Sequence, residues 1–113
     1  MRRELAYLDD ILECIAKVEE YLTGVDKAAF QSNQLLQDAV AHNLMIIGEA
    51  VKRLPETVTQ KQPQIDWRGI TRMRDKLIHH YFAVRLDVVW STATQDLLPL
   101  KTAVTELLKE LDT

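Results

Sequence analysis

Residues that interrupt regular structure are scarce in this 113-residue chain, which has three glycines, three prolines and one cysteine. So few turn-forming residues argue against a many-stranded sheet and favour helices. The single Cys14 excludes an internal disulfide and fits a reducing compartment. The glycines at positions 24, 48 and 69 are too far apart to form a phosphate-binding loop.

A long hydrophobic run is missing as well. The longest apolar stretch, Leu44 to Gly48, is far below the roughly 20 residues that span a bilayer. The N-terminal residues reach acidic positions before any apolar stretch develops, which does not fit a secretory signal. Apolar residues make up 47% and charged residues 27%, which is the usage of a soluble globular protein. We expect one cytoplasmic domain over residues 1–113, with no membrane partner.

The charge balance excludes a globally basic nucleic-acid-binding protein, because 14 Lys and Arg face 17 Asp and Glu, a net charge of -3. A local basic patch remains open. Between Asp66 and Asp87 only Asp75 is acidic, whereas five residues are basic: Arg68, Arg72, Arg74, Lys76 and Arg85. A charged, solvated helix face explains this excess as well as an RNA-binding surface does.

The histidines do not predict a metal site. His42 stands alone, and the adjacent His79 and His80 would point about 100° apart on a helix. No His-x-x-x-His pair is present. We therefore predict no metal ligands and no cofactor.

Apolar residues recur at steps of three and four and predict an all-α fold, an antiparallel bundle of four to five helices. Gly24 should end the first helix and Pro55 the second, whereas Ser32 and Asp66 should cap the second and third. Pro99 marks a kink or restart in the last. The four predicted helices cover about residues 5–22, 35–54, 67–82 and 86–111.

Arg74 is an unexpected residue on the third predicted helix. At about 100° per residue, it lies about 40° from Ile70, inside the apolar arc that includes Leu77 and Tyr81. A buried guanidinium needs a partner. Either Arg74 pairs with an acid of another helix, such as Glu49, or it lines a cleft for an anion. Gly48, inside the second helix, suggests a close helix approach.

His79 lies on the polar side of the same helix, about 140° from Arg74. It is four residues after Asp75, so a solvated or Asp75-paired histidine is one interpretation. A joint role with Arg74 requires either that the helix deforms near His79 or that two copies of the chain share a groove.

The segment RDKLIHHY, residues 74–81, matches the R-x-x-x-x-H-x-Y pattern of the HepT-like proteins of the HEPN superfamily. Residues 35–56 resemble the second helix of these proteins, and residues 66–82 resemble their motif helix and its lead-in, so the resemblance covers nearly the whole chain. Arg74 and His79 match the defining pair, Asp75 the polar residue after the arginine, and Tyr81 the tyrosine.

The resemblance implies a toxin of a type VII toxin–antitoxin pair: a helical bundle that forms a homodimer through its motif helices, with both motifs facing one cleft. It implies metal-independent endoribonuclease activity with Arg74 and His79 as catalytic residues and Asp75 in support. It also implies a minimal nucleotidyltransferase as the antitoxin, which would silence the toxin by AMPylation of Tyr81. Arg68, Arg72 and Lys76 are candidates for RNA binding.

Two other interpretations remain open. One is a non-catalytic helical module that binds the nucleotidyltransferase or a nucleotide through Arg74 and His79. The other is a structural dimer in which Arg74 forms an internal salt bridge. A guanidinium locked on an internal acid, with His79 pointing into solvent far from any copy of it, would contradict the nuclease hypothesis.

Overall fold

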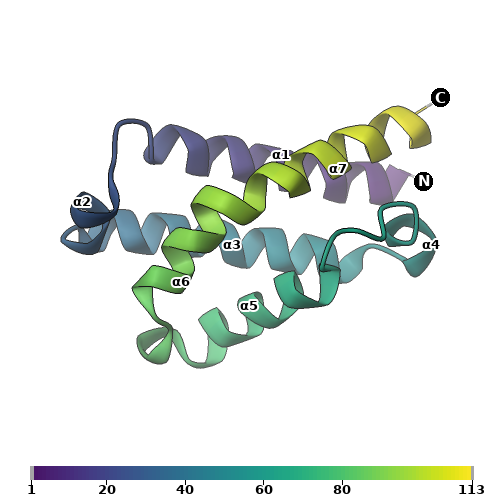
Figure 1. The fold of residues 1–113 in the computed structure, drawn as a ribbon. Coiled ribbons are helices and arrows are strands. Elements are labelled where there is room, and N and C mark those ends of the chain that lie inside the picture. The colour runs from purple at the N-terminus through teal and green to yellow at the C-terminus, as the bar shows by residue number, and fades with distance from the viewer. Residues whose placement is uncertain (1, 113) are drawn as a thin grey trace.

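The computed structural model describes residues 2–112, and the regular secondary structure of this part is all helical. Four long rods run up and down in chain order, with α1 and α7 side by side and α5 at the opposite edge (Figure 1). The all-α antiparallel bundle is therefore confirmed. The rods are α1 (Arg2–Tyr21), α3 (Gln34–Arg53), α5 (Trp67–His79) and a continuous rod of α6 (Leu86–Ser91), the π-helical η2 (Thr92–Asp96) and α7 (Leu97–Leu111). Shorter elements are α2 (Lys27–Gln31), α4 (Glu56–Thr59) and the 3₁₀ turn η1 (Tyr81–Ala83).

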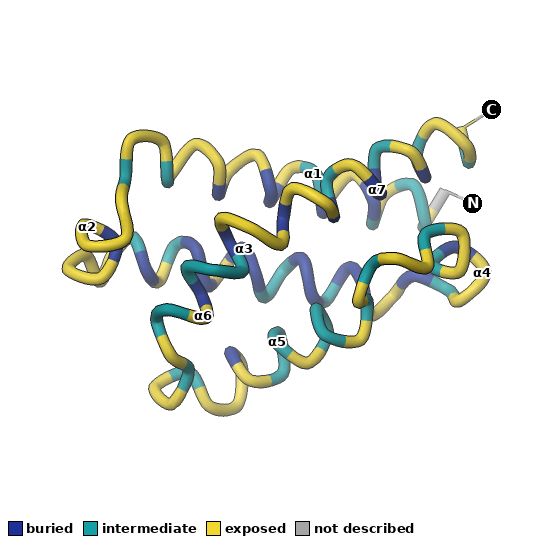
Figure 2. Tube along the Cα trace, in the orientation of Figure 1, coloured by how far each residue is buried: buried dark blue, intermediate teal, exposed yellow. Residues whose placement is uncertain are grey.

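Helix α3 is the centre of the bundle, because it packs against α1 on one side and α5 on the other. The core is formed mainly by α1, α3 and α7. Its largest fully buried side chains include Leu8, Ile11, Ile15, Phe30, Ile47, Leu100 and Leu107. Helix α5 contributes only one buried residue, Leu77, and most of its length is exposed or half-buried (Figure 2). The helix that carries the motif is therefore the least covered of the four rods.

The predicted cap of the second helix was wrong by one residue. Asn33, not Ser32, caps α3, and its side chain accepts a hydrogen bond from the backbone N–H of Leu36 at 3.0 Å. Ser32 instead ends α2, where its hydroxyl donates to the carbonyls of Ala28 and Ala29. The sequence analysis did not predict α2. The predicted ends at Gly24, which has a φ of 72°, and at Pro55 agree with the structure.

The predicted break near Pro99 takes the form of a wider turn just before it. Pro99 is the third residue of α7, and the π-helical η2 ends three residues earlier at Asp96. Proline has no N–H, and its ring collides with the carbonyl four residues back in a regular helix. A π-helical turn changes the register of the backbone before the proline, so the rod continues without ending.

Candidate functional site

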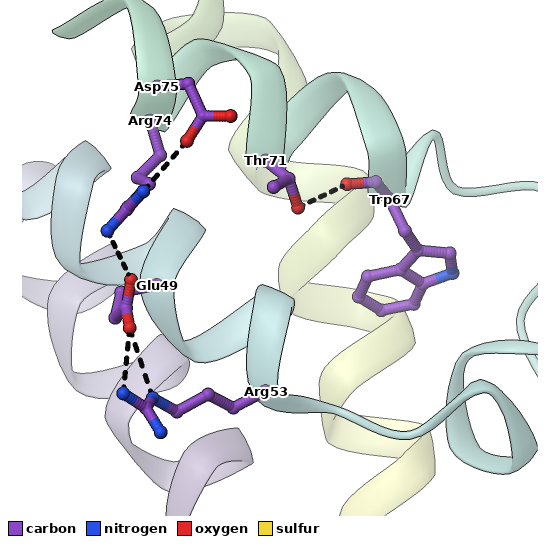
Figure 3. Close-up of polar contacts among 6 residues, drawn as sticks. All are labelled: Glu49, Arg53, Trp67, Thr71, Arg74 and Asp75. Carbon is purple, nitrogen blue, oxygen red and sulfur yellow. Dashed lines mark hydrogen bonds and ion pairs between the residues drawn. The ribbon is translucent and has the colours of Figure 1, made fainter. Parts of the chain in front are cut away.

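The start of helix α5 is fixed by three hydrogen bonds. Asp66 caps the helix as predicted, and its Oδ1 accepts from the backbone N–H of Gly69 at 3.0 Å. The indole N–H of Trp67 donates to the carbonyl of Gln62 at 3.0 Å, and the Thr71 hydroxyl donates to the Trp67 carbonyl at 3.3 Å (Figure 3). These contacts fix where α5 begins and tie its first residue to the preceding loop.

Gly48 allows α5 to approach α3 closely at the position of Arg74. A Cβ atom built on Gly48 would overlap the Cβ of Arg74 and would lie 3.2 Å from the Ile70 carbonyl oxygen. Only glycine fits here without movement of the α5 backbone. The predicted close approach is confirmed, and it places the stem of Arg74 directly against the α3 backbone.

The guanidinium of Arg74 is held between two carboxylates. Its Nη2 lies 2.7 Å from Glu49 Oε2 on α3, and its Nη1 donates to Asp75 Oδ1 at 2.8 Å (Figure 3). Arg53 binds the other oxygen of Glu49, with Nε and Nη2 each 3.1 Å from Oε1. The pairing of Arg74 with Glu49, one of the two alternatives from the sequence, is therefore present.

This cluster lies at the surface and is not sealed in the core. The Arg74 side chain is 20% exposed, that of Glu49 38% and that of Asp75 48%. The hydrogen bond to Asp75 raises the pKa of the guanidinium, with help from the charge of Glu49. The same bond, and the charge of Arg74, lower the pKa of the Asp75 carboxyl. Arg74 Nε is buried and makes no hydrogen bond to any described residue. Each terminal nitrogen of Arg74 makes one of the two carboxylate contacts and keeps a second N–H, so the cluster presents a permanently charged, oriented guanidinium.

His79 does not share this position within one chain. It is exposed at the end of α5, which remains helical through His79, so the angle of about 140° between the two side chains applies. Its ring contacts that of His80, with centroids 6.5 Å apart. Part of the geometry that would contradict a nuclease is therefore present, because Arg74 is paired with acids and His79 faces solvent. The remaining part is the distance from His79 to the Arg74 of a second copy. A site that used both side chains would therefore need a second copy of the chain.

The predicted length of the motif helix was wrong at its C-terminal end. The sequence predicted a helix to residue 82, but α5 ends at His79, and His80 leaves the helical conformation with φ of -139° and ψ of 41°. Histidine, aromatic and β-branched residues, which follow here up to Val84, are weak helix formers. Tyr81 is consequently placed in η1, where its direction is set by a contact with α3.

The Tyr81 hydroxyl donates a hydrogen bond to Asp38 Oδ1 of α3. Partial burial, the hydrogen bond and the charge of Asp38 together raise the pKa of Tyr81 to about 12. The hydroxyl is therefore protonated at neutral pH and next to a carboxylate that can accept its proton. Asp38 was not predicted from the sequence, because nothing in the local pattern reveals a contact between positions 38 and 81.

The basic residues of α5 do not form one patch. Arg68 is exposed. Arg72 lies 3.8 Å from Asp66 Oδ2 and, together with Lys76, lines a groove that faces η1 and α6. This groove lies on the side of α5 away from Arg74, and it also contains His80 and Arg85, which the sequence analysis did not join to Arg72 and Lys76.

Residues 2–112 contain no cluster of three or more His, Cys, Asp or Glu side chains that is suited to a metal ion. None of the helices in this range combines the length and the apolar character needed to cross a membrane. Cys14 is buried, as expected for a packing residue.

Comparisons with known proteins agree on one family. The family described as ribonuclease HepT-like matches residues 11–107. The chain is 43% identical over 95 residues to a probable ribonuclease HepT of Thermococcus cleftensis, covering 84% of this chain and 86% of that protein. It is 36% identical over 107 residues to a protein of Methanocaldococcus jannaschii named as a candidate RNase, covering 95% and 88%. A candidate RNase of Caldanaerobacter subterraneus subsp. tengcongensis is 36% identical over 110 residues, covering 97% and 98%. No solved structure is significantly similar.

Proposed function

The chain belongs to the HepT-like family of the HEPN superfamily, and from this premise we propose that it is a metal-independent endoribonuclease, the toxin of a toxin–antitoxin pair. The active form is a homodimer. Each of its two sites combines Arg74 of one subunit with His79 of the other, because the two side chains diverge on a single helix.

The observation that carries this proposal is an uncovered apolar surface next to the motif. Ile78 is 45% exposed and Phe82 is 96% exposed, one on each side of His79 and Tyr81 in the chain. Large apolar side chains left in solvent beside a candidate site are typical of an interface. A second copy that covers Ile78 and Phe82 brings its own motif to the same cleft.

The residue chemistry suits RNA cleavage through the 2′-oxygen. His79 takes the proton from the 2′-hydroxyl, the 2′-oxygen attacks phosphorus, and the bond to the 5′-oxygen of the next nucleotide breaks. The 5′-oxygen leaves with the proton that the His79 imidazolium returns. An imidazole has an unperturbed pKa near 6.5 and can carry out such transfers at neutral pH. Arg74, kept charged and oriented by Glu49 and Asp75, stabilises the extra negative charge on the phosphorane with its unused N–H groups.

Tyr81 is the proposed site of silencing by a nucleotidyltransferase antitoxin. Its oxygen attacks the α-phosphorus of a nucleoside triphosphate held by the partner, pyrophosphate leaves, and Asp38 accepts the phenolic proton. The hydrogen bond between Tyr81 and Asp38 supports this assignment of the base. The attached AMP adds negative charge and bulk near the motif and competes with RNA for Arg74.

The second candidate is a non-catalytic module that binds the nucleotidyltransferase or a nucleotide through Arg74 and His79. The ion pairs of Arg74 with Glu49 and Asp75 favour it, because a guanidinium held in place by two carboxylates can bind an anion without taking part in catalysis. In that case the protein retains its partner but does not cut RNA.

The test is incubation of purified protein with RNA in the presence of a chelator. The wild type should cleave, and both Arg74→Ala and His79→Ala should lose at least about 10²-fold in rate while remaining folded by circular dichroism. His42→Ala, an exposed histidine of α3, is the matched control and should cleave normally. Absence of cleavage by the wild type, with retained partner binding, would favour the module. Unfolding of Arg74→Ala would favour a structural salt bridge.

A further inference from the structure

A groove on the far side of α5 from Arg74 combines an apolar floor with a basic rim. It lies between the middle of α5, the η1 turn and the start of α6, and its volume is about 520 Å³. The rim is formed by Arg72, Lys76, His80 and Arg85. The floor is formed by Gly69, Met73, Ala83, Val84 and Val88.

No acidic residue lines this groove, although the whole chain carries a net charge of -3. Two of its cations have acidic neighbours outside the lining: Arg72 lies 3.8 Å from Asp66, and Arg85 binds Asp87 at 2.6 Å. Lys76 makes no ion pair with any residue in the range 2–112. The groove is thus a local positive site on an acidic protein, and it attracts anions.

The shape and chemistry point to a ligand that is part apolar and part anionic. A volume of this size is within the range of about 300–1,000 Å³ that is common for small-molecule sites. The Met73 and Val88 side chains offer a surface for the flat face of a base, while the arginine and lysine groups at the rim suit phosphate oxygens. We propose that this groove binds a nucleotide unit, either a free nucleoside monophosphate or one nucleotide of a single-stranded RNA.

The position of the groove relative to His79 favours a nucleotide next to the scissile bond. At about 100° per residue, His79 is about 20° from Arg72 around α5, whereas Arg74 is about 160° away from Arg72. The His79 ring also contacts His80, which lines the groove. A nucleotide held in the groove therefore has the His79 of the same subunit beside it. In its RNA form this inference rests on the proposed function.

The experiment measures binding without cleavage. The probe is a fluorescein-labelled single-stranded RNA of about ten nucleotides, long enough for such a site, with 2′-O-methyl groups that block attack by the 2′-oxygen. Fluorescence anisotropy is recorded with the full chain at several salt concentrations. The groove variant is Lys76→Gln with Arg85→Gln. The matched control is Lys17→Gln with Lys109→Gln, which removes the same charge from exposed positions on α1 and α7.

The groove variant should bind at least about tenfold more weakly than the control, and its slope of log K against log salt should fall by about 1.4, or about 0.7 for each lost phosphate contact. A groove variant that binds the RNA like the control, with the same salt slope, rules out an RNA strand as the ligand of the groove.

A second arm separates the two sources of the nucleotide. AMP is added to ¹⁵N-labelled protein, and amide shifts in residues 72–85 are compared between wild type and groove variant. Shifts that disappear in the variant support a free nucleotide, and groove-dependent binding of the RNA probe alone supports a strand. If neither ligand depends on the groove, the inference is wrong.

The cleavage assay is independent of this result. If binding depends on the groove but the wild type does not cleave RNA, the groove is supported as a binding site and the proposed ribonuclease activity is rejected. Cleavage by the wild type, together with RNA binding that does not depend on the groove, supports the nuclease and rejects the groove as a binding site for RNA.

Discussion

Arg74 is oriented from both sides, and this arrangement decides what the residue can do. A guanidinium has five N–H donors in one plane. Glu49 and Asp75 engage one terminal nitrogen each, and both carboxylates are partly exposed. The pairing that the sequence offered as a structural alternative is therefore also compatible with catalysis, since the same acids can fix an arginine that still faces a substrate.

Tyr81 gives the clearest prediction at the scale of a single residue. Phenolate absorbance is recorded against pH for the wild type and for Tyr81→Phe. The difference between the two curves belongs to Tyr81 and should titrate near pH 12. Because the folded-state pKa is raised, the stabilisation from this group is fully present below pH 10, the ordinary value, and is lost as the pH rises through about 12.

Asp38→Asn should shift this titration down towards pH 10, because it removes the charge of Asp38, whereas Asp9→Asn, at an exposed position of α1, should not. A Tyr81 that titrates normally in the wild type would contradict the contact with Asp38.

In the presence of the antitoxin, Tyr81→Phe should accept no AMP. Label entering this variant at the wild-type level would make the assignment wrong.

Helix α5 is attached to the bundle mainly through α3. It contributes one buried side chain, Leu77, and meets α3 closely at Gly48. Gly48→Ala should therefore destabilise the protein by about 1–3 kcal/mol, because the added methyl group overlaps Arg74 and approaches the Ile70 carbonyl.

Chemical denaturation measures this change. His42→Ala, on the exposed side of the same helix, should stay within about 0.5 kcal/mol of the wild type. If Gly48→Ala were as stable as the wild type or more so, as a helical glycine-to-alanine change in open space would be, the close approach of α3 and α5 would be refuted.

The long rods could be predicted from the sequence because their apolar periodicity is regular over five turns or so. The two ends of α5 show the limit of what a local sequence pattern can predict. Asp66 carries its capping chemistry in one residue, so the start was found. The end at His79 was missed because the apolar pattern of α5 continues to Phe82, and no local pattern contains the contact of Tyr81 with Asp38. For the same reason Glu49 could be offered only as one alternative, and the groove with His80 and Arg85 was not found.

The two proposed sites exist only in a dimer of the whole molecule. Phe82→Ser should convert the dimer to a monomer and reduce RNA cleavage, because Phe82, at 96% exposure, is proposed to be buried only by the second copy. Leu98→Ser is the control, since Leu98 is another exposed apolar residue, 64% exposed, on α7. Sedimentation velocity gives the mass of each. A wild type that is monomeric, or a Phe82→Ser protein that stays dimeric, would contradict this interface.

The central claim, that Arg74 and His79 from different subunits form each site, is tested most directly by mixing two inactive variants. Arg74→Ala and His79→Ala are purified separately, mixed in equal amounts and allowed to exchange subunits, with exchange followed by native mass spectrometry. About half of the dimers are then mixed, each with one intact site of two, so about a quarter of the wild-type cleavage rate should return. If subunits exchange and cleavage does not return, the shared site does not exist.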